Sequence, residues 1–353
     1  MSALVRLDGV RKRYGRADVL KHVTLSMEPG EFVVLIGGSG SGKTTLLRLV
    51  AGLARADGGT IELRGMIVDH ARKGRFVPAE RRRLGMVFQD YALWPHFTCL
   101  QNVEAAARGT TAAKRARARE LLRRVGMADF AATRPHQLSG GQQQRVGVAR
   151  ALAAEPDLLL FDEALSSLDV DIRERLRLEI RQLSQETGAA ALFVSHDPVD
   201  AWRLADRVMV LEDGRLTQDA APTALYAEPK TARVARFIGA GGGFLSTVEY
   251  QNGALGVRLA GHFCPVQASS VPPGTRGLVY VRPEGIRLSK RGVPAELQFC
   301  AFEAGRYRAY WRIEGIDGNL SSHEASKPTS TAHLAIAPEH ILIYPTDGDI
   351  RTS

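Results

Sequence analysis

Cysteine is scarce in this sequence of 353 residues, and long apolar runs are absent. The three cysteines, Cys99, Cys264 and Cys300, are far apart and form no Cys-x-x-Cys pair. We therefore predict neither a disulfide framework nor a zinc site, which fits a reducing cytosol. No apolar stretch approaches the length of a membrane span, and the first residues lack the apolar segment of a secretory signal.

The chain carries an excess of positive charge, with 47 Lys and Arg against 38 Asp and Glu, a formal net charge of +9. Such a charge allows nucleic acid or an anionic membrane face as a partner. The basic residues are scattered rather than gathered in one tract, and an arginine-rich composition from a GC-rich genome explains the excess at least as well. The charge alone therefore predicts no partner.

Short apolar runs alternate with helical stretches in the first two thirds of the chain. The apolar runs are Glu31–Ile36, Leu158–Phe161, Ala190–Val194 and Val208–Leu211. Continuous apolar runs are typical of parallel strands that are buried on both faces. Helical patterns at Thr44–Leu53 and Asp171–Gln185 lie between them. This alternation predicts an α/β core with a parallel sheet.

The stretch Asn102–Ala153 interrupts the strand pattern. It is rich in Ala, Arg, Leu and Gln, which are good helix formers or common in helices. We expect it to be wholly helical and to form a subdomain of about residues 90–153, inserted in an α/β domain of residues 1–238.

The composition changes at the glycine run 239–243, which predicts a linker. Short β-like runs separated by Pro and Gly follow it, so we expect a small all-β domain over residues 244–353. A weak internal echo, Pro283-Glu284-Gly285-Ile286 and Pro338-Glu339-His340-Ile341, suits two matched strand beginnings in a small barrel.

The sequence Gly37-Gly38-Ser39-Gly40-Ser41-Gly42-Lys43-Thr44 matches a phosphate-binding loop between a strand and a helix. Its glycines let backbone amides converge on phosphate oxygens, and the helix adds its N-terminal dipole. Lys43 is expected to pair with the β- and γ-phosphates and the Thr44 hydroxyl to bind Mg²⁺. The expected nucleotide contacts are Gly37, Ser39, Gly40, Gly42, Lys43, Thr44 and Thr45.

Asp162 and Glu163 follow a buried strand, at the edge where parallel sheets bind ligands. We expect Asp162 to hold Mg²⁺ and Glu163 to polarise the attacking water as general base. Taken alone, two solvated acids at a strand end would be the simpler interpretation.

Three further side chains are weak signals when each is taken alone. Gln89 follows an apolar strand, and its neutral amide can ligate Mg²⁺ or orient water. His196 lies just past a strand and can reach a γ-phosphate, whereas Ser195-His196-Asp197 is no catalytic triad because successive strand residues face opposite sides. Tyr14 can stack on adenine.

The string Leu138-Ser139-Gly140-Gly141-Gln142 precedes a helical stretch that begins at Gln143. Ser139 is a good N-cap and the glycines expose backbone amides, which predicts a second phosphate-binding helix terminus. The helix terminus after the glycine loop and the one at Ser139 cannot easily contact the same triphosphate if both belong to one chain. A facing copy of the chain can supply the second.

In combination these motifs resemble the ATPase subunit of an ABC transporter over residues 4–237. They match that family in order: the aromatic A-loop, Walker A, the Q-loop, the signature, Walker B with the catalytic glutamate, the D-loop and the switch histidine. The matching positions are Tyr14, Gly37–Thr44, Gln89, Leu138–Gln142, Leu158–Glu163, Ser166–Asp169 and His196. Ala164 departs from the proline of many relatives but removes no reactive group.

The resemblance implies ATP and Mg²⁺ as cofactors, with Asp169 near the shared nucleotide site of a homodimer. It also implies two membrane-spanning permease subunits, an extracytoplasmic solute-binding protein and a place at the cytoplasmic face of the bacterial membrane. The segment Phe88–Phe97 resembles importers of ferric iron, polyamines or phosphonates, and the β-rich tail, with Arg282-Pro283-Glu284, resembles a transport-associated OB-like domain.

Two rival functions are also compatible with parts of the sequence. The first is a soluble ABC ATPase that acts on DNA or ribosomes, although the chain has a single phosphate-binding loop and no sustained heptads. The second is an anion-binding module without turnover, which would need neither Glu163 nor His196. We expect no nucleic-acid partner.

Overall fold

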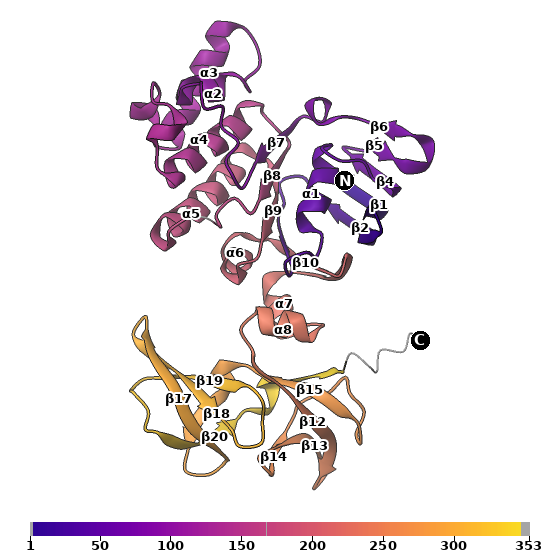
Figure 1. Cartoon of the computed structure of the whole chain (residues 1–353), viewed down its shortest axis with the longest axis vertical. Helices are drawn as coiled ribbons and strands as arrows, with labels where there is room; N and C mark the ends of the chain where they lie inside the picture. Colours follow the sequence, from indigo (N-terminus) through magenta and orange to yellow (C-terminus); the bar gives the residue numbers. More distant parts are fainter. Residues whose placement is uncertain (1–2, 167, 347–353) are drawn as a thin grey trace. The chain divides into compact units, whose positions relative to one another are not determined.

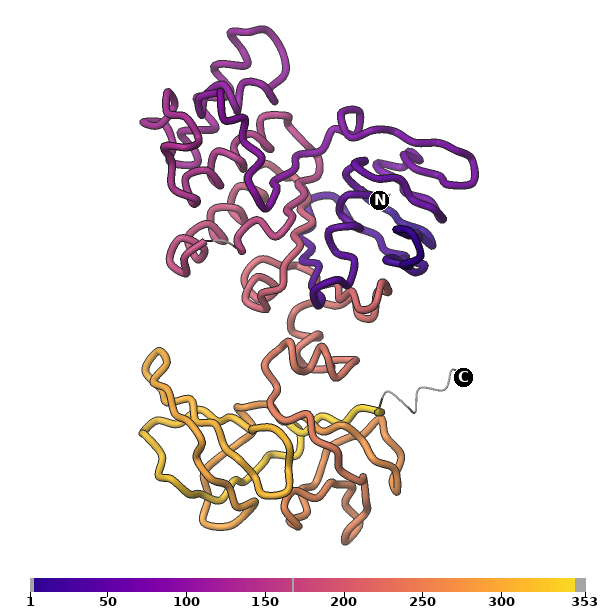
Figure 2. The backbone as a smooth tube through the Cα atoms, viewed as in Figure 1, coloured from indigo at the N-terminus to yellow at the C-terminus, as the bar shows by residue number. Residues whose placement is uncertain are grey.

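A computed structural model describes residues 3–166 and 168–346. The chain divides into two compact units, Met1–Leu225 and Tyr226–Ser353. Each unit has its own sheets, which can be followed by colour in Figure 1 and along the backbone in Figure 2. The glycine run predicted to be a linker does not separate the units, because residues 241–243 lie inside a strand of the second unit.

The first unit contains the predicted parallel sheet, with strand order β11-β10-β3-β9-β8-β7. Its strands are β3 (Phe32–Ile36), β7 (Leu84–Val87), β8 (Leu158–Asp162), β9 (Ala190–Ser195), β10 (Arg207–Glu212) and β11 (Arg215–Ala220). All neighbours pair in parallel except β10 and β11. The register sets Ile36 beside Ser195 and Asp162 beside Val194, so their loops leave from one edge.

A second, antiparallel sheet in this unit was not predicted. It has the order β2-β1-β4-β5-β6 and contains β1 (Val5–Tyr14), β2 (Ala17–Met27), β4 (Gly58–Leu63), β5 (Met66–His70) and β6 (Arg75–Phe76). The short 3-10 helices η1 (Ala71–Lys73) and η2 (Ala79–Arg81) flank β6. Both sheets share one apolar core, in which α1 (Lys43–Ala51) buries residues such as Leu46 and Leu49.

The helical part of the first unit is less regular than predicted. It contains α2 (Cys99–Glu104), α3 (Thr111–Arg124), η3 (Ala128–Phe130), η4 (Pro135–Gln137) and α4 (Gly140–Ala153). The prediction of a wholly helical stretch is therefore wrong, because non-helical segments precede two of the helices, each of which begins at a capping residue. Thr110 caps α3 and Ser139 caps α4, each by accepting a backbone N–H bond.

Three more helices follow in the first unit and at its end. They are α5 (Val170–Thr187), α6 (Pro198–Leu204) and α7 (Pro222–Ala227). Across the part of the chain that the structure describes, no helix is both long and apolar enough to cross a membrane.

Among its described residues the second unit is all-β apart from the end of α7, α8 (Ala232–Phe237) and two 3-10 turns, which confirms the predicted class and is consistent with an OB-like domain. One sheet has the order β14-β13-β12-β15-β21 and the other β16-β20-β17-β18-β19. The strands are β12 (Gly241–Gln251), β13 (Ala254–Leu259), β14 (His262–Pro265), β15 (Arg276–Val281), β16 (Ile286–Ser289), β17 (Val293–Glu303), β18 (Arg306–Arg312), β19 (Asn319–Glu324), β20 (Thr331–Ile336) and β21 (Ile341–Pro345).

The sequence echo in the second unit corresponds to a repeated structure. Each copy forms a 3-10 turn, η5 (Pro283–Gly285) or η6 (Pro338–His340), and leads directly into a strand. The two turns approach so closely that a Cβ at Gly285 would lie 2.2 Å from the Cβ of His340. The glycine is therefore required for the turns to meet.

Candidate active site

The glycine loop connects β3 to α1 at the carboxyl edge of the parallel sheet. Gly42 caps α1 with a φ of 104°, in the left-handed region that favours glycine. At Gly37 a Cβ would lie 2.2 Å from the carbonyl oxygen of Leu211. Gly38, Ser39 and Gly40 at the tip are exposed. The loop thus keeps its backbone accessible while its base packs tightly.

The Lys43 side chain curls back under the loop. Its Nζ donates to the carbonyl oxygens of Gly37 at 2.9 Å and Gly38 at 3.0 Å. Burial lowers the pKa of Lys43, while the nearby Glu163 and Asp162 carboxylates oppose that shift. The Ser41 hydroxyl is buried and has no hydrogen-bond partner among the described residues. A cation and an unpartnered hydroxyl in the same loop suit an anionic ligand.

Thr44 and Asp162 meet at the end of β8. The Thr44 hydroxyl donates a 2.8 Å hydrogen bond to Asp162 Oδ1. Burial raises the pKa of Asp162, and the Thr44 hydrogen bond partly offsets the increase. No group of three or more His, Cys, Asp or Glu side chains among the described residues could hold a metal ion alone. A metal here would need ligand oxygens from phosphate or water, as Mg²⁺ prefers.

The structure brings Glu163 and His196 together from two different loops. Glu163 has a φ of 47°, which turns it away from the line of β8. Its Oε2 lies 3.4 Å from His196 Nδ1, and the His196 side chain is 57% exposed. Ser195 points elsewhere and donates to Asp200, so the consecutive Ser195-His196-Asp197 forms no triad. The pair Glu163 and His196 is open to a ligand.

The remaining predicted nucleotide residues in the first half of the chain lie at separate places on the first unit. Gln89 is exposed in the turn after β7, at the same sheet edge as Asp162 because β7 and β8 are parallel. Tyr14 ends β1 with half of its surface exposed, and Lys12 Nζ lies 5.2 Å from the centroid of its ring. Thr45 lies in the first turn of α1 and is half-buried.

Ser139 caps α4, which begins three residues earlier than predicted. Ser139 Oγ accepts from the Gln142 amide, and Gln142 Oε1 accepts from the Ser139 amide at 2.9 Å. The Gln142 side chain is thereby engaged in a capping box. Cβ atoms at Gly140 and Gly141 would lie 3.1 Å from Tyr91 Oη and 2.6 Å from Ile172 Cγ2. These glycines therefore also allow close packing.

Asp169 is exposed where α5 begins. It belongs to the predicted D-loop, Ser166–Asp169, of which Ser167 lies outside the described residues.

Sequence reasoning missed Arg150 on α4. Its guanidinium is buried, donates to the carbonyl oxygens of Tyr91, at 3.0 Å, and Ala92, and lies 5.3 Å from the centroid of Trp94. Tyr91 and Ala92 have φ values of 60° and 46°, uncommon for residues other than glycine. Arg150 therefore holds a strained turn just after Gln89. No local sequence pattern marks this long-range contact.

Comparison with known proteins finds relatives over most of the chain. A family model described as ABC transporter matches residues 20–166. The chain is 42% identical over 296 residues to the spermidine/putrescine import ATP-binding protein PotA of Shigella dysenteriae and of Escherichia coli K12. The match covers 82% of this chain and 77% of each relative.

Two solved structures are similar to about two thirds of the chain. One is the dimeric ATP-binding cassette MJ0796 bound to ADP and phosphate, with 32% identity and a TM-score of 0.54 over 62% of this chain and 98% of that one. The other is cbiO1 from Clostridium perfringens, part of the ABC transporter complex cbiONQ, with 25% identity and a TM-score of 0.58 over 67% and 95%.

Proposed function

Since the chain belongs to the ABC transporter family, we propose that it is the ATP-binding subunit of an importer for a small organic polycation. As a member of that family it is an ATPase coupled to transport. The observation that carries the solute class is the 42% identity to import ATP-binding proteins for spermidine and putrescine. Sequence patterns alone left ferric iron, polyamines and phosphonates open.

In this proposal the glycine loop holds the phosphates of ATP. The backbone amides of Gly37, Ser39, Gly40 and Gly42 face the phosphate oxygens, and Lys43 pairs with the β- and γ-phosphates. Thr45 adds a contact in the first turn of α1, and Tyr14 stacks on the adenine. The unpartnered Ser41 hydroxyl and the Lys43 ammonium, which lies against the Gly37 and Gly38 carbonyl oxygens of the same loop, support this assignment.

Thr44 and Asp162 are the proposed protein ligands of Mg²⁺, with Gln89 as a third. When bound, Mg²⁺ neutralises charge on the β- and γ-phosphates. The hydrogen bond from Thr44 to Asp162 supports the assignment, because it brings a hydroxyl and a carboxylate oxygen to one place beside the glycine loop. The donor set is all oxygen, as this cation requires.

Glu163 is the proposed general base, and it accepts a proton from the water that attacks the γ-phosphate. His196 contacts the γ-phosphate and, through its 3.4 Å approach to the carboxylate, orients Glu163. Gln89 orients the water from the neighbouring turn. The left-handed conformation of Glu163 supports a functional role, because strained backbone is concentrated at active sites.

The second phosphate-binding terminus is proposed to act across a homodimer. Ser139, Gly140 and Gly141 of one copy would face the ATP held by Lys43 of the other, with Gln142 bracing the cap and Asp169 beside the shared boundary. The exposed Ser139 at the start of a well-capped helix supports this arrangement. So does the dimeric cassette to which the chain is similar.

Two membrane-spanning permease subunits are the proposed partners, which places the chain at the cytoplasmic face of the bacterial membrane. They would be fed by an extracytoplasmic solute-binding protein. The docking surface is the exposed aromatic segment around Trp94, which is 41% exposed and rests on Arg150. The relatives are import subunits and support this set of partners.

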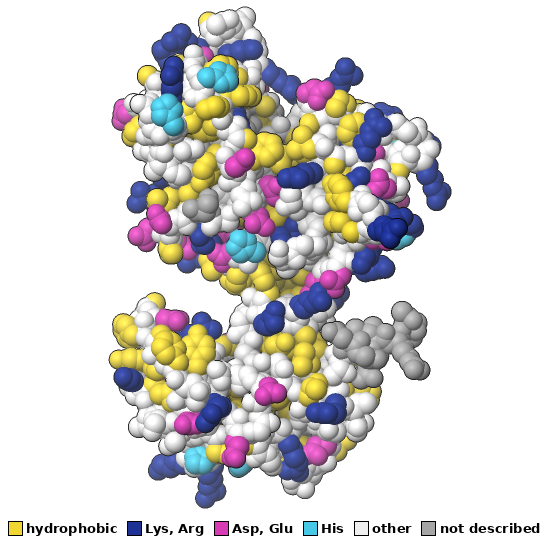
Figure 3. All heavy atoms as spheres, in the orientation of Figure 1, with side chains coloured by type: hydrophobic (Ala, Val, Ile, Leu, Met, Phe, Trp, Pro, Cys, Tyr) yellow, Lys and Arg dark blue, Asp and Glu magenta, His cyan; other side chains and the backbone are white. Residues whose placement is uncertain are grey.

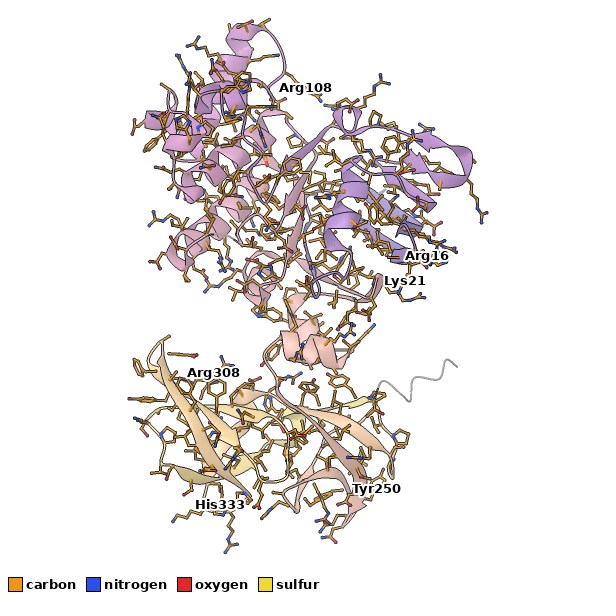
Figure 4. The ribbon with its side chains drawn as sticks, viewed as in Figure 1. Arg16, Lys21, Arg108, Tyr250, Arg308 and His333 are labelled. Atoms are coloured by element: carbon orange, nitrogen blue, oxygen red, sulfur yellow. The ribbon has the colours of Figure 1, made fainter. Side chains whose placement is uncertain are left out.

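A function on nucleic acid is not favoured. Figure 3 shows Lys and Arg side chains scattered over the visible face of each unit rather than gathered in one patch. Figure 4 places Arg16 and Lys21 by the β1–β2 hairpin and Arg108 in the loop before α3, well apart on the first unit. Scattered cations make a poor phosphate-binding surface.

Solute uptake by cells that lack this gene tests the proposal. We expect uptake of labelled spermidine or putrescine to fall and to return with the wild-type gene, but not with Lys43→Ala. Ferric iron and a phosphonate serve as control solutes in the same cells. Loss of iron or phosphonate uptake alone would show that the solute assignment is wrong while leaving the ATPase assignment intact.

A further inference from the structure

Two arginines on α5, Arg173 and Arg177, lie one helical turn apart and face the loop after β9. Arg177 is nearly fully buried and donates to three carboxylates, at 2.6 Å to Asp200, 2.6 Å to Asp197 and 2.7 Å to Glu174. A buried cation that is fully paired in this way holds α5 firmly against α6. Arg177 therefore links α5 to Asp197 and Asp200 without any contribution from Arg173.

The residues on both sides of His196 are fixed by this network. The Ser195 hydroxyl donates to Asp200 and accepts from the Asp197 amide at 2.9 Å. His196 itself remains more than half exposed and meets Glu163 at 3.4 Å. The backbone around the histidine is thus held from the protein side, while its ring is free to act on a ligand.

Arg173 differs from Arg177 because it reaches two loops rather than one. Its Nη2 donates to the carbonyl oxygens of Leu168, at 2.8 Å, and Ser166, at 3.4 Å. Its Nη1 lies 3.4 Å from Asp197 Oδ2. Ser166 in turn donates from its hydroxyl to the Glu163 carbonyl oxygen at 2.8 Å. One guanidinium therefore connects the loop that carries Glu163 with the loop after β9.

We propose that Arg173 is a positioning residue that sets the separation of Glu163 and His196 by clamping the loops that carry them. The inference rests on the roles given to these two residues in the proposed function. A planar guanidinium can donate to the carbonyls and the carboxylate at once, in a fixed fork. A misplacement of about 1 Å costs up to about a hundredfold in rate, so the clamp affects turnover.

If Arg173 had a purely structural role, its loss would lower stability rather than selectively lower the rate. Its side chain is 24% exposed, and two of its three bonds are 3.4 Å long. Arg177 already ties α5 to Asp197 and Asp200 through shorter, buried bonds. Loss of Arg173 should therefore change stability little, and any large effect on the rate would come from the geometry of the site.

The test compares Arg173→Met and Arg173→Lys with a matched control on the same helix. Arg181 is 25% exposed and pairs with Asp206, at 3.0 Å for one of its bonds, away from both loops. Turnover number, KM for ATP, ATP affinity and Tm are measured for the full-length protein. We expect Arg173→Met to lower kcat at least about tenfold with little change in ATP affinity or Tm. Arg173→Lys should recover part of the rate, and Arg181→Met should match wild type.

A double variant with His196→Ala shows whether the clamp acts through the histidine. We expect Arg173→Met added to His196→Ala to slow single-turnover phosphate release no further. If the double variant were slowed by the product of the two single-variant rate reductions, the proposal would be overturned. Wild-type turnover in Arg173→Met would overturn it too. If the Met variant does not fold, Arg173→Gln, which can donate to one loop but cannot bridge both, must show the same selective loss of kcat. Inactive wild-type protein would instead contradict the proposed function.

Discussion

The Thr44 hydroxyl donates to Asp162 Oδ1 at 2.8 Å, although the two residues are 118 positions apart in the sequence. Thr44 belongs to the first turn of α1 and Asp162 ends β8. The bond therefore joins the glycine loop to the acidic strand end. Because Asp162 is buried, its raised pKa means that ionisation of this carboxyl destabilises the ligand-free fold.

Asp162→Asn should stabilise the ligand-free protein near neutral pH. The folded-state pKa of Asp162 lies above its unfolded value. The free-energy cost of ionising Asp162 in the folded protein is therefore complete above the folded pKa and disappears below the unfolded pKa. The variant keeps an amide oxygen that can accept from Thr44. We expect a higher Tm than wild type at about pH 7.5, and convergence with wild type toward about pH 4. A lower Tm at neutral pH would contradict the burial argument.

A mixed dimer tests the shared site. Lys43→Ala and Ser139→Arg each damage both sites of their own homodimer, whereas co-assembly leaves one site intact and puts both lesions in the other. We expect the mixture to recover part of the phosphate release that each variant lacks, provided one intact site can turn over. A ligand-bound structure in which Ser139 contacts the ATP held by Lys43 of the same chain would contradict the shared site.

Several elements of the candidate site could be predicted from the sequence because each consists of residues that are neighbours in the chain. The glycine loop, the Ser139 cap and the acidic pair after β8 each have a local pattern. The contact between Glu163 and His196 follows instead from the register that sets Asp162 beside Val194. Register of this kind is set by tertiary packing, which no local pattern records.

The unpredicted strands of the antiparallel sheet and the helical stretch that was predicted too long can also be explained physically. β1 and β2 pair with several register shifts, which blur the alternation of buried and exposed residues that identifies a strand. The Ala- and Arg-rich stretch has high helix propensity throughout, so propensity alone hides where it ends. Its ends are marked by Thr110, the left-handed Gly126 and the cap at Ser139.

Trp94→Ala should weaken assembly with the permease while leaving ATP affinity unchanged. Trp94 is 41% exposed and lies against Arg150, which also binds the strained turn at Tyr91 and Ala92. Leu178→Ala, at an exposed position on α5, is a matched control for the loss of apolar surface. Co-purification of the permease measures assembly. A parallel loss of Tm and ATP affinity would indicate core packing instead.

The second unit should be dispensable for ATP chemistry and is proposed to brace the dimer. Ala235 of α8 packs with Tyr280 and Tyr344 of that unit, so a chain that ends with α7 at Ala227 is a cleaner truncation than one that ends at Phe237. We expect comparable turnover per dimer, with any loss recovered at high protein concentration. A folded, dimeric truncation that cannot hydrolyse ATP at any concentration would show that the second unit takes part in the chemistry.

Glu163 as general base is the central residue of the proposed ATPase site. The decisive measurement is steady-state phosphate release by Glu163→Gln at saturating ATP, with ATP affinity measured in parallel. Gln keeps the size of the side chain and its approach to His196 but cannot take a proton. We predict unchanged or tighter ATP binding and a rate about 10²–10⁴-fold lower, equivalent to about 3–5 kcal/mol of barrier. Near-normal turnover in this variant would contradict the account.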